Sequence, residues 1–214
     1  MRLSMTELVF MNSVTKGPEP LNIQLKLPVL ALKARVIDDT LDTLQAKYIL
    51  DTDRKLTKAG LIPLRLFELY KNASEHFLIN RMRIARTSDG KWIFLVPVDE
   101  LWECFALEPV FCMSLILSTF PFLRQGQDRN AEAGLPRPFT DDQKKKLEKT
   151  AQQELAIKTF TNRKLTSACQ YSFTGEKCFL IDCLKQEISE ILPRDARVQI
   201  MKMLKIEGDD KHGS

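Results

Sequence analysis

The stretch Arg81-Met-Arg-Ile-Ala-Arg-Thr-Ser-Asp-Gly-Lys-Trp-Ile-Phe-Leu-Val-Pro-Val98 decides the fold that the sequence predicts. Two apolar runs flank an Asp-Gly pair, which is a strong short-range signal for a β-hairpin. If Asp89 and Gly90 are the two turn residues, a type I′ turn is expected and Ile84 faces Leu95. A loop of three residues would change this register. Both alternatives predict a basic, apolar hairpin over residues 77–98.

Helical patterns precede the hairpin. Asp39–Leu50 begins with a capping aspartate and continues with apolar residues at helical spacing. A short helix is expected over Asp53–Gly60. Pro63 suits the first turn of a further helix that extends to Ser74, because proline lacks the N–H group that is unpaired there.

This order of helices followed by a hairpin resembles the winged-helix family, over about 60 residues and without a residue motif. The resemblance implies duplex DNA binding, with Pro63–Ser74 as the recognition helix and the hairpin as the wing. That helix carries Arg65, Glu68 and Lys71, which is not a uniformly basic face. The alternative, which we favour, is a helix packed on a β-sheet.

Strands are expected at the amino-terminal end. Met5–Val14 contains a short apolar run, and residues 21–27 alternate between apolar and polar side chains, which is typical of a half-buried strand. The alternation changes phase after Pro28 and continues to Val36, which indicates a bulge or an edge position. After the hairpin, a helix is expected from Asp99, and Val110–Phe120 is a buried strand or a core helix.

The carboxyl-terminal half is expected to be mainly helical. Residues 124–138 are polar and aperiodic and predict a flexible linker. Thr140 and Gln143 form a capping-box pattern at the start of a lysine-rich helix. Apolar spacing predicts two further helices, over 180–191 and 198–204. The predicted fold class is therefore α+β: mixed strands and helices with a central hairpin over 1–123, a linker over 124–138, a helical region over 139–206 and a disordered tail over 207–214.

The composition says more about the cellular compartment of the protein than about its chemistry. The 214 residues carry a formal net charge of +4, and the five cysteines form no Cys-x-x-Cys pair. An odd set of cysteines in apolar runs fits reduced thiols in the cytoplasm or nucleus. The apolar run over 110–123 is shorter than the roughly 20 residues that a membrane span needs, and no signal peptide is expected. The sequence therefore favours an intracellular protein without a transmembrane segment.

Two basic clusters are the candidate binding residues. Arginine suits phosphate oxygens and aromatic rings can stack on bases, so the hairpin and the lysine helix can contact nucleic acid or another anionic partner. The alternative is a pair of solvated faces. The candidates are Arg81, Arg83, Arg86, Lys91, Trp92, Lys144, Lys145, Lys146 and Lys149.

The leading hypothesis is a non-catalytic protein that binds RNA, DNA or an acidic protein through these residues. The second is a self-assembling structural protein, similar to a viral matrix protein, whose basic surface faces an anionic membrane. The third is an enzyme, for which His76 is the one candidate residue. No catalytic motif, cofactor site or metal site is expected, and Cys178 and Cys183 have no histidine nearby.

Overall fold

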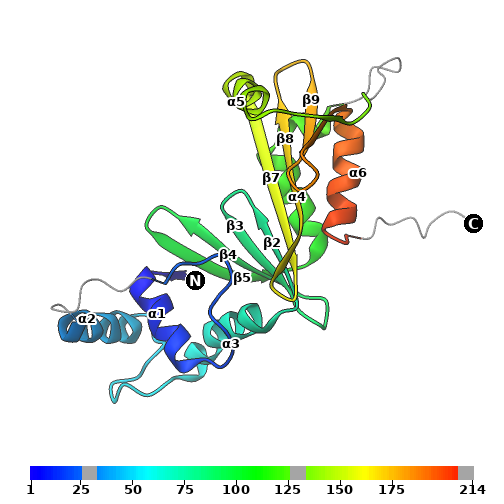
Figure 1. Cartoon of the computed structure of the whole chain (residues 1–214). Helices are drawn as coiled ribbons and strands as arrows, with labels where there is room; N and C mark the ends of the chain where they lie inside the picture. Colours follow the sequence, from blue (N-terminus) through cyan, green and yellow to red (C-terminus); the bar gives the residue numbers. More distant parts are fainter. Residues whose placement is uncertain (26–32, 126–133, 207–214) are drawn as a thin grey trace, which may run out of the picture. The chain divides into compact units, whose positions relative to one another are not determined.

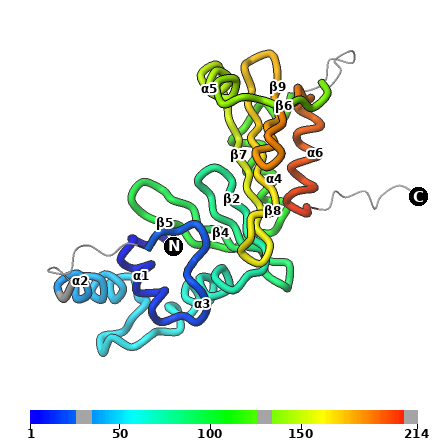
Figure 2. Tube along the Cα trace, viewed as in Figure 1, coloured from blue at the N-terminus to red at the C-terminus, as the bar shows by residue number. Residues whose placement is uncertain are grey.

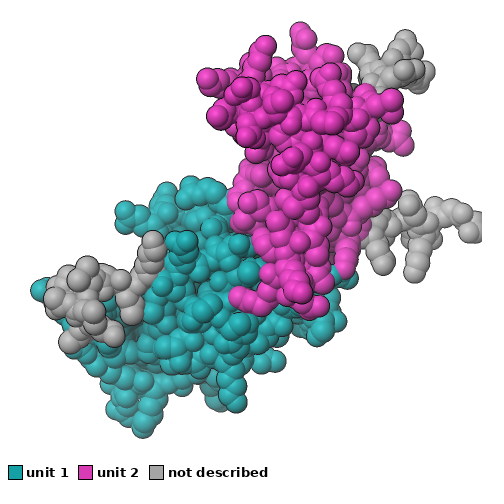
Figure 3. Space-filling view, in the orientation of Figure 1, with its two compact units in different colours: residues 1–76, 81–107 teal, residues 77–80, 108–214 magenta. Residues whose placement is uncertain are grey.

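A computed structural model describes residues 1–25, 33–125 and 134–206. The chain forms two compact units (Figure 3). Unit 1 consists of Met1–His76 and Arg81–Leu107, and unit 2 consists of Phe77–Asn80 and the chain from Glu108 onward. The expected linker and tail, 124–138 and 207–214, lie largely outside the described residues, so the predicted domain limits stay a prediction.

Antiparallel strands form the framework of each unit (Figure 1). In unit 1 the order is β1-β5-β4-β3, and from β2, where the chain passes into unit 2, the order continues as β2-β7-β8-β9-β10-β6. The bounds are β1 Arg2–Leu3, β2 Glu75–Ile79, β3 Met82–Arg86, β4 Trp92–Val98, β5 Leu101–Leu107, β6 Arg137–Pro138, β7 Gln153–Thr161, β8 Lys164–Phe173, β9 Cys178–Asp182 and β10 Glu187–Ile191. Figure 2 traces the chain through these strands.

The expected hairpin exists as β3 and β4, but its first arm is shorter than expected, because residues 77–79 belong to the separate strand β2. Its expected type I′ register is also wrong. Ile84 faces Phe94 rather than Leu95. The amide of Gly90 donates to the carbonyl oxygen of Thr87, and the Thr87 amide donates to Lys91, so the loop has three residues. Gly90 has a φ of 82°, whereas a type I′ turn needs two consecutive residues with positive φ. A slip of one residue reverses which side chains share a face.

Helices replace the strands expected at the amino-terminal end. Met5–Val14 is α1, and it begins with a capping box in which the Ser4 side chain accepts from the Glu7 amide and Glu7 accepts from the Ser4 amide. The second expected strand, over 21–27 and continuing past Pro28 to Val36, is also wrong where it is described, because α2 spans Lys33–Ala46. Residues 21–25 form a turn and irregular chain, and 26–32 lie outside the described residues.

One continuous helix, α3, spans Lys58–Asn72 and includes Pro63. Thr57 caps it, so the separate helix expected over Asp53–Gly60 is wrong. Its apolar stripe, which includes Phe67 and Tyr70, is buried in one core with β3, β4 and β5. Unit 1 therefore has the alternative that the sequence favoured, a helix packed on a sheet.

After the hairpin, one expected helix is wrong, and the segment that was expected as a strand or a helix proves to be a helix. Asp99 and Glu100 form a two-residue turn, Asp99 with a φ of 54°, and the chain continues as β5 rather than as a helix. The undecided apolar run is a helix, α4 (Pro109–Thr119), with Pro109 in its first turn. A short 3₁₀ helix, η2 (Pro121–Arg124), follows it.

The expected mainly helical carboxyl-terminal region is wrong, and with it the predicted fold class. Strands β7 to β10 occupy most of that region, and the helices there are α5 (Asp141–Thr150) and α6 (Pro193–Met203). Asn162 and Arg163 both have positive φ and make the tight turn between β7 and β8. The expected helix over 180–191 is a hairpin, because the Asp182 carboxylate accepts from the amides of Leu184 and Lys185 and turns the chain there.

The sheet of unit 2 is covered differently on its two faces. On one face, the Phe122 ring of η2 stacks on Phe173 at 5.4 Å between ring centroids, and the Ser167 hydroxyl contacts the Met203 sulfur of α6 at 3.7 Å. Tyr171 shares this face and is fully buried. The opposite face carries Phe179, because Phe179 pairs with Ser172 rather than with Tyr171. Helix α5 lies over this opposite face, and it has no buried residue.

Candidate binding groove

The arginines of the hairpin have structural partners. The Arg83 guanidinium lies 4.8 Å from the ring centre of Trp102, and its Nε donates to the backbone oxygen of Asn22 at 3.0 Å. Partial burial lowers the Arg83 pKa. Arg86 forms an ion pair with Glu75 at 3.4 Å. Through these contacts, both arginines interact with other residues of unit 1.

The other hairpin candidates are spread over different environments. Lys91 forms an exposed ion pair with Asp89 at 3.4 Å, and Arg81 is exposed. Trp92 is fully buried, so its ring is not accessible for stacking on a base. The hairpin residues therefore do not form one continuous basic patch. Binding through them stays a prediction.

The lysines of α5 point in different directions. The expected capping box at Thr140 and Gln143 is confirmed, and it fixes where the helix begins. Lys144 lies 3.8 Å from Glu148 one turn later, whereas Lys145 and Lys149 are exposed. Lys146 lines a groove between α5 and the sheet.

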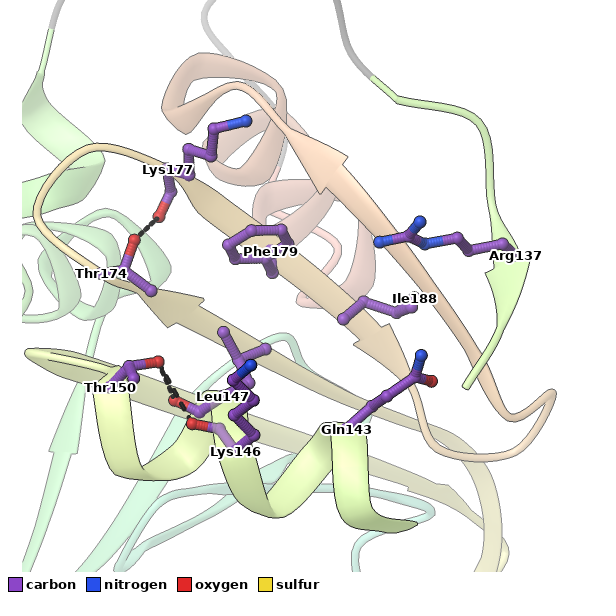
Figure 4. A pocket seen from close by; sticks show the side chains of 9 residues that line it. All are labelled: Arg137, Gln143, Lys146, Leu147, Thr150, Thr174, Lys177, Phe179 and Ile188. Carbon is purple, nitrogen blue, oxygen red and sulfur yellow. Dashed lines mark hydrogen bonds between the residues drawn. The ribbon is translucent and has the colours of Figure 1, made fainter. Parts of the chain in front are cut away.

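This groove is the candidate functional site (Figure 4). It has a volume of about 510 Å³. Figure 4 shows Phe179 of β9 and Ile188 of β10 between the ends of the groove, with Leu147 of α5 across from them. All three apolar side chains are partly exposed. The full lining is Arg137, Gln143, Lys146, Leu147, Thr150, Thr174, Lys177, Phe179 and Ile188.

The charge of the groove is of one sign. None of its nine lining residues is acidic, and three are cationic. Lys177 forms an ion pair with Glu190 at 2.9 Å, while no ion pair to a described residue is found for Arg137 or Lys146. An apolar floor with unneutralised cations at its edge suits a ligand that is both apolar and anionic.

A second hollow lies in unit 1, between α1 and α2. It has a volume of about 300 Å³, and its lining is predominantly apolar and carries no charged side chain. The lining residues are Thr6, Val9, Phe10, Ser13, Val36, Ile37 and Thr40. It offers no orienting charge, so the groove of unit 2 is the stronger candidate.

The one catalytic candidate is part of the core. His76 is 1% exposed, and its Nε2 lies 2.8 Å from the backbone oxygen of Tyr70. Burial raises the pKa of the Cys104, Cys112 and Cys178 thiols to about 12, which keeps these thiols protonated and unreactive at neutral pH. Among the described residues, no group of three or more potential metal-binding side chains lies together.

Sequence reasoning found one side chain of the groove and missed most of the others. Lys146 was a candidate, but Arg137 was assigned to a linker, and Lys177, Phe179 and Ile188 to a helical region. The available signal was Asn162, a residue type that favours turns and that lies, with positive φ, between β7 and β8.

Comparison with known proteins gives a family and a fold. No helix in the described part of the chain is long and apolar enough to cross a membrane. A search of curated proteins finds no match. The fold is similar to that of the Mycobacterium tuberculosis type VII secretion system chaperone EspG5, solved in complex with a PE25–PPE41 dimer. The TM-score is 0.59 at 8% identity, and the alignment covers 100% of this chain and 98% of EspG5. The profile of a domain of unknown function, DUF5081, matches residues 1–201, and the chain therefore belongs to the DUF5081 family.

Proposed function

We propose that this chain is a non-catalytic, chaperone-like protein that binds a protein partner inside the cell. The observation that carries the proposal is the similarity to EspG5, which extends over the whole of both folds rather than over one unit. EspG5 is a chaperone that was solved with a bound protein dimer. One fold can host unrelated functions, so this similarity supports the proposal by analogy: the fold would present a surface to another protein.

The surface of this chain supports a protein partner rather than a nucleic acid. A phosphate-binding surface gathers several accessible cations along one track. Here Arg83 and Arg86 are engaged within unit 1, and Trp92 is buried. The groove of unit 2 instead combines apolar side chains with two cations, Arg137 and Lys146. This is the composition expected of a surface that binds an acidic protein segment.

Co-expression tests the proposal. Each protein encoded beside this chain in its source genome is produced with and without it, and the mixtures are analysed by size-exclusion chromatography with light scattering. A stoichiometric complex, together with a larger soluble fraction of the partner, is expected. If no neighbour forms a complex or gains solubility, the chaperone proposal is refuted.

The same protein is titrated against single- and double-stranded RNA and DNA by fluorescence anisotropy at low and physiological salt. Flat titrations are expected. Tight binding with a steep salt dependence would favour the nucleic-acid hypothesis in place of the chaperone. Light scattering of the chain alone tests self-assembly, because a structural protein would form oligomers that grow with concentration.

A further inference from the structure

The groove under α5 has the chemistry of a site for one particular kind of peptide. We propose that it binds an acidic segment of a partner protein that inserts one apolar anchor side chain into the groove. This inference rests on the proposed function and adds to it the place of binding and the class of segment that is bound.

The anchor position follows from the apolar lining. Phe179 and Ile188 project from neighbouring strands on the face that α6 does not cover, and Leu147 projects toward them from α5. Their partial exposure means that a leucine or phenylalanine inserted among them would remove apolar surface on both partners from water. A volume of about 510 Å³ admits such a side chain together with the adjoining backbone.

The acidic character follows from the charges beside that position. Arg137 lies on β6 at one end of the groove, and Lys177 lies at the other end (Figure 4). Lys177 already contacts Glu190, so Arg137 and Lys146 are the cations without an ion pair to a described residue. Carboxylates on either side of the apolar anchor would meet these two groups, and the Arg137 guanidinium can bind a carboxylate through two parallel hydrogen bonds.

A nucleic acid fits the groove less well. Its backbone would need a run of cations, whereas the groove offers two unneutralised ones and an aliphatic floor. The aromatic ring of the groove, Phe179, is flanked by Ile188 and Leu147 rather than by a second ring, which does not make a stacking platform for successive bases.

The occupant would also complete the packing of α5. Each residue of this helix is at least partly exposed, and at its end the Gln152 amide donates to the backbone oxygen of Phe173 at 2.7 Å. A bound segment would place apolar atoms against Leu147. The amides of α5 are therefore expected to exchange more slowly with deuterium when the groove is filled.

The test uses a fluorescein-labelled peptide, Glu-Glu-Leu-Glu-Glu-Phe-Glu-Glu, with the full chain. Saturable micromolar binding is expected in anisotropy titrations at physiological salt, with slowed exchange in α5. Two control peptides replace every Glu by Gln, or Leu and Phe by Ser, and both are expected to bind at least about tenfold more weakly, which is about 1.4 kcal/mol. No saturable binding, or equal binding of either control peptide, would overturn the proposal.

Matched variants locate the site. Arg137→Glu with Lys146→Glu is expected to weaken binding at least about tenfold. Lys145→Glu with Lys149→Glu makes the same change of charge at two residues of α5 that do not line the groove. The affinity of this control variant is expected to stay within about threefold of that of the unchanged protein. Leu147→Ser removes apolar lining from a partly exposed position and is expected to weaken binding without loss of the circular dichroism spectrum. Equal losses in the two charge pairs would show general charge attraction and would refute the groove.

The outcome can be separated from that of the proposed function. If a genomic neighbour forms a complex and the Arg137→Glu, Lys146→Glu protein retains it, the chaperone proposal stands and the groove proposal fails. If that pair instead abolishes binding of single-stranded RNA and leaves peptide binding unchanged, the groove binds a nucleic acid and the peptide proposal fails.

Discussion

Replacing Lys47 by methionine is expected to destabilise unit 1, because the buried carboxylate of Glu7 at the start of α1 loses its compensating charge. Glu7 is 1% exposed at its side chain, and its Oε2 accepts from Lys47 Nζ at 2.7 Å and from the Ser4 amide at 2.6 Å. Its Oε1 has no hydrogen-bond partner among the described residues. Methionine keeps the unbranched stem of Lys47 but removes the charge that compensates the carboxylate.

The magnitude follows from the exposure of the two partners. Removing one partner of a fully buried pair costs about 3–5 kcal/mol, whereas exposed pairs contribute about 0–1 kcal/mol. Glu7 is buried, but the Lys47 side chain is 35% exposed, which places this pair between the two limits. We expect a coupling energy of about 2 kcal/mol between Glu7 and Lys47. The bond from Lys47 to the backbone oxygen of Arg2, 2.9 Å long, is lost as well and must be separated from the coupling.

A double-mutant cycle makes that separation. Glu7→Gln removes the charge and keeps an oxygen for the Ser4 amide, since glutamine also completes a capping box. Lys47→Met, Glu7→Gln and the double variant are unfolded in guanidinium and followed by tryptophan fluorescence. Both tryptophans, Trp92 and Trp102, lie in unit 1, so the signal reports the unit that contains the pair. If Lys47→Met costs the same in both backgrounds, the carboxylate does not depend on the lysine, and the reasoning is wrong.

Three further predictions concern stability. Gly60→Ala is expected to destabilise unit 1 by about 2 kcal/mol or more, because a Cβ at this position would lie 2.3 Å from the backbone oxygen of Ile49. Elsewhere in a helix the same substitution usually stabilises. The guanidinium assay measures the effect, and a gain in stability would contradict this prediction. Phe122→Ala should destabilise the protein by about 3–5 kcal/mol, because it leaves a cavity beside Phe173. The control Phe111→Ala, at a ring that is 57% exposed, should cost about 0.5 kcal/mol or less. Circular dichroism during denaturation compares the two variants, and equal losses of stability would contradict the packing of Phe122. Stability should fall as the pH rises from about 9 toward about 12, because thiols ionise in the unfolded chain before they ionise in the folded one, with a slope of up to about 1.4 kcal/mol per pH unit for each thiol. Cysteine-to-alanine variants should flatten this slope, and an unchanged slope would contradict the assignment to three buried residues: Cys104, Cys112 and Cys178.

Local signals in the sequence were informative where one short pattern decides the outcome. The capping box at Thr140 and Gln143 predicted the start of α5 correctly. The same pattern stands at Ser4 and Glu7, but the apolar run behind it was interpreted as a strand. A run of four apolar residues fits a helix or a strand equally well, and only the cap distinguishes them.

The carboxyl-terminal half could not be assigned from periodicity. Leu180, Ile188 and Ile191 recur at spacings that fit a helix, but the turn at Asp182 divides them between two strands. Pro193, taken as the end of that helix, begins α6 instead. Strands β8, β9 and β10 pair in chain order through short turns, so their assignment depends on recognising those turns rather than on apolar spacing.

The groove, in contrast, depends on pairing between distant segments of the chain. Arg137 reaches the groove because β6 pairs with β10, about 50 residues later in the chain. Lys146 arrives there on α5, and Lys177 arrives with the turn before β9. Each residue alone is an ordinary surface cation, so their convergence follows from the topology and not from any local motif.

Because unit 2 includes residues 77–80, a fragment that begins at Glu108 is not the whole of this unit. Asn80 belongs to unit 2, where its amide donates to the backbone oxygen of Ala156 and its side chain bonds Glu154 and Ala156. A fragment that begins at Glu108 would lack these partners and would leave an edge of β7 open to pairing with other molecules. During synthesis, residues 77–80 leave the ribosome long before β7 does, so the pairing of β2 with β7 can form only after Thr161 has been made. A deletion variant that joins residues 77–80 through a short linker to the chain from Glu108 onward is the form in which unit 2 could be isolated.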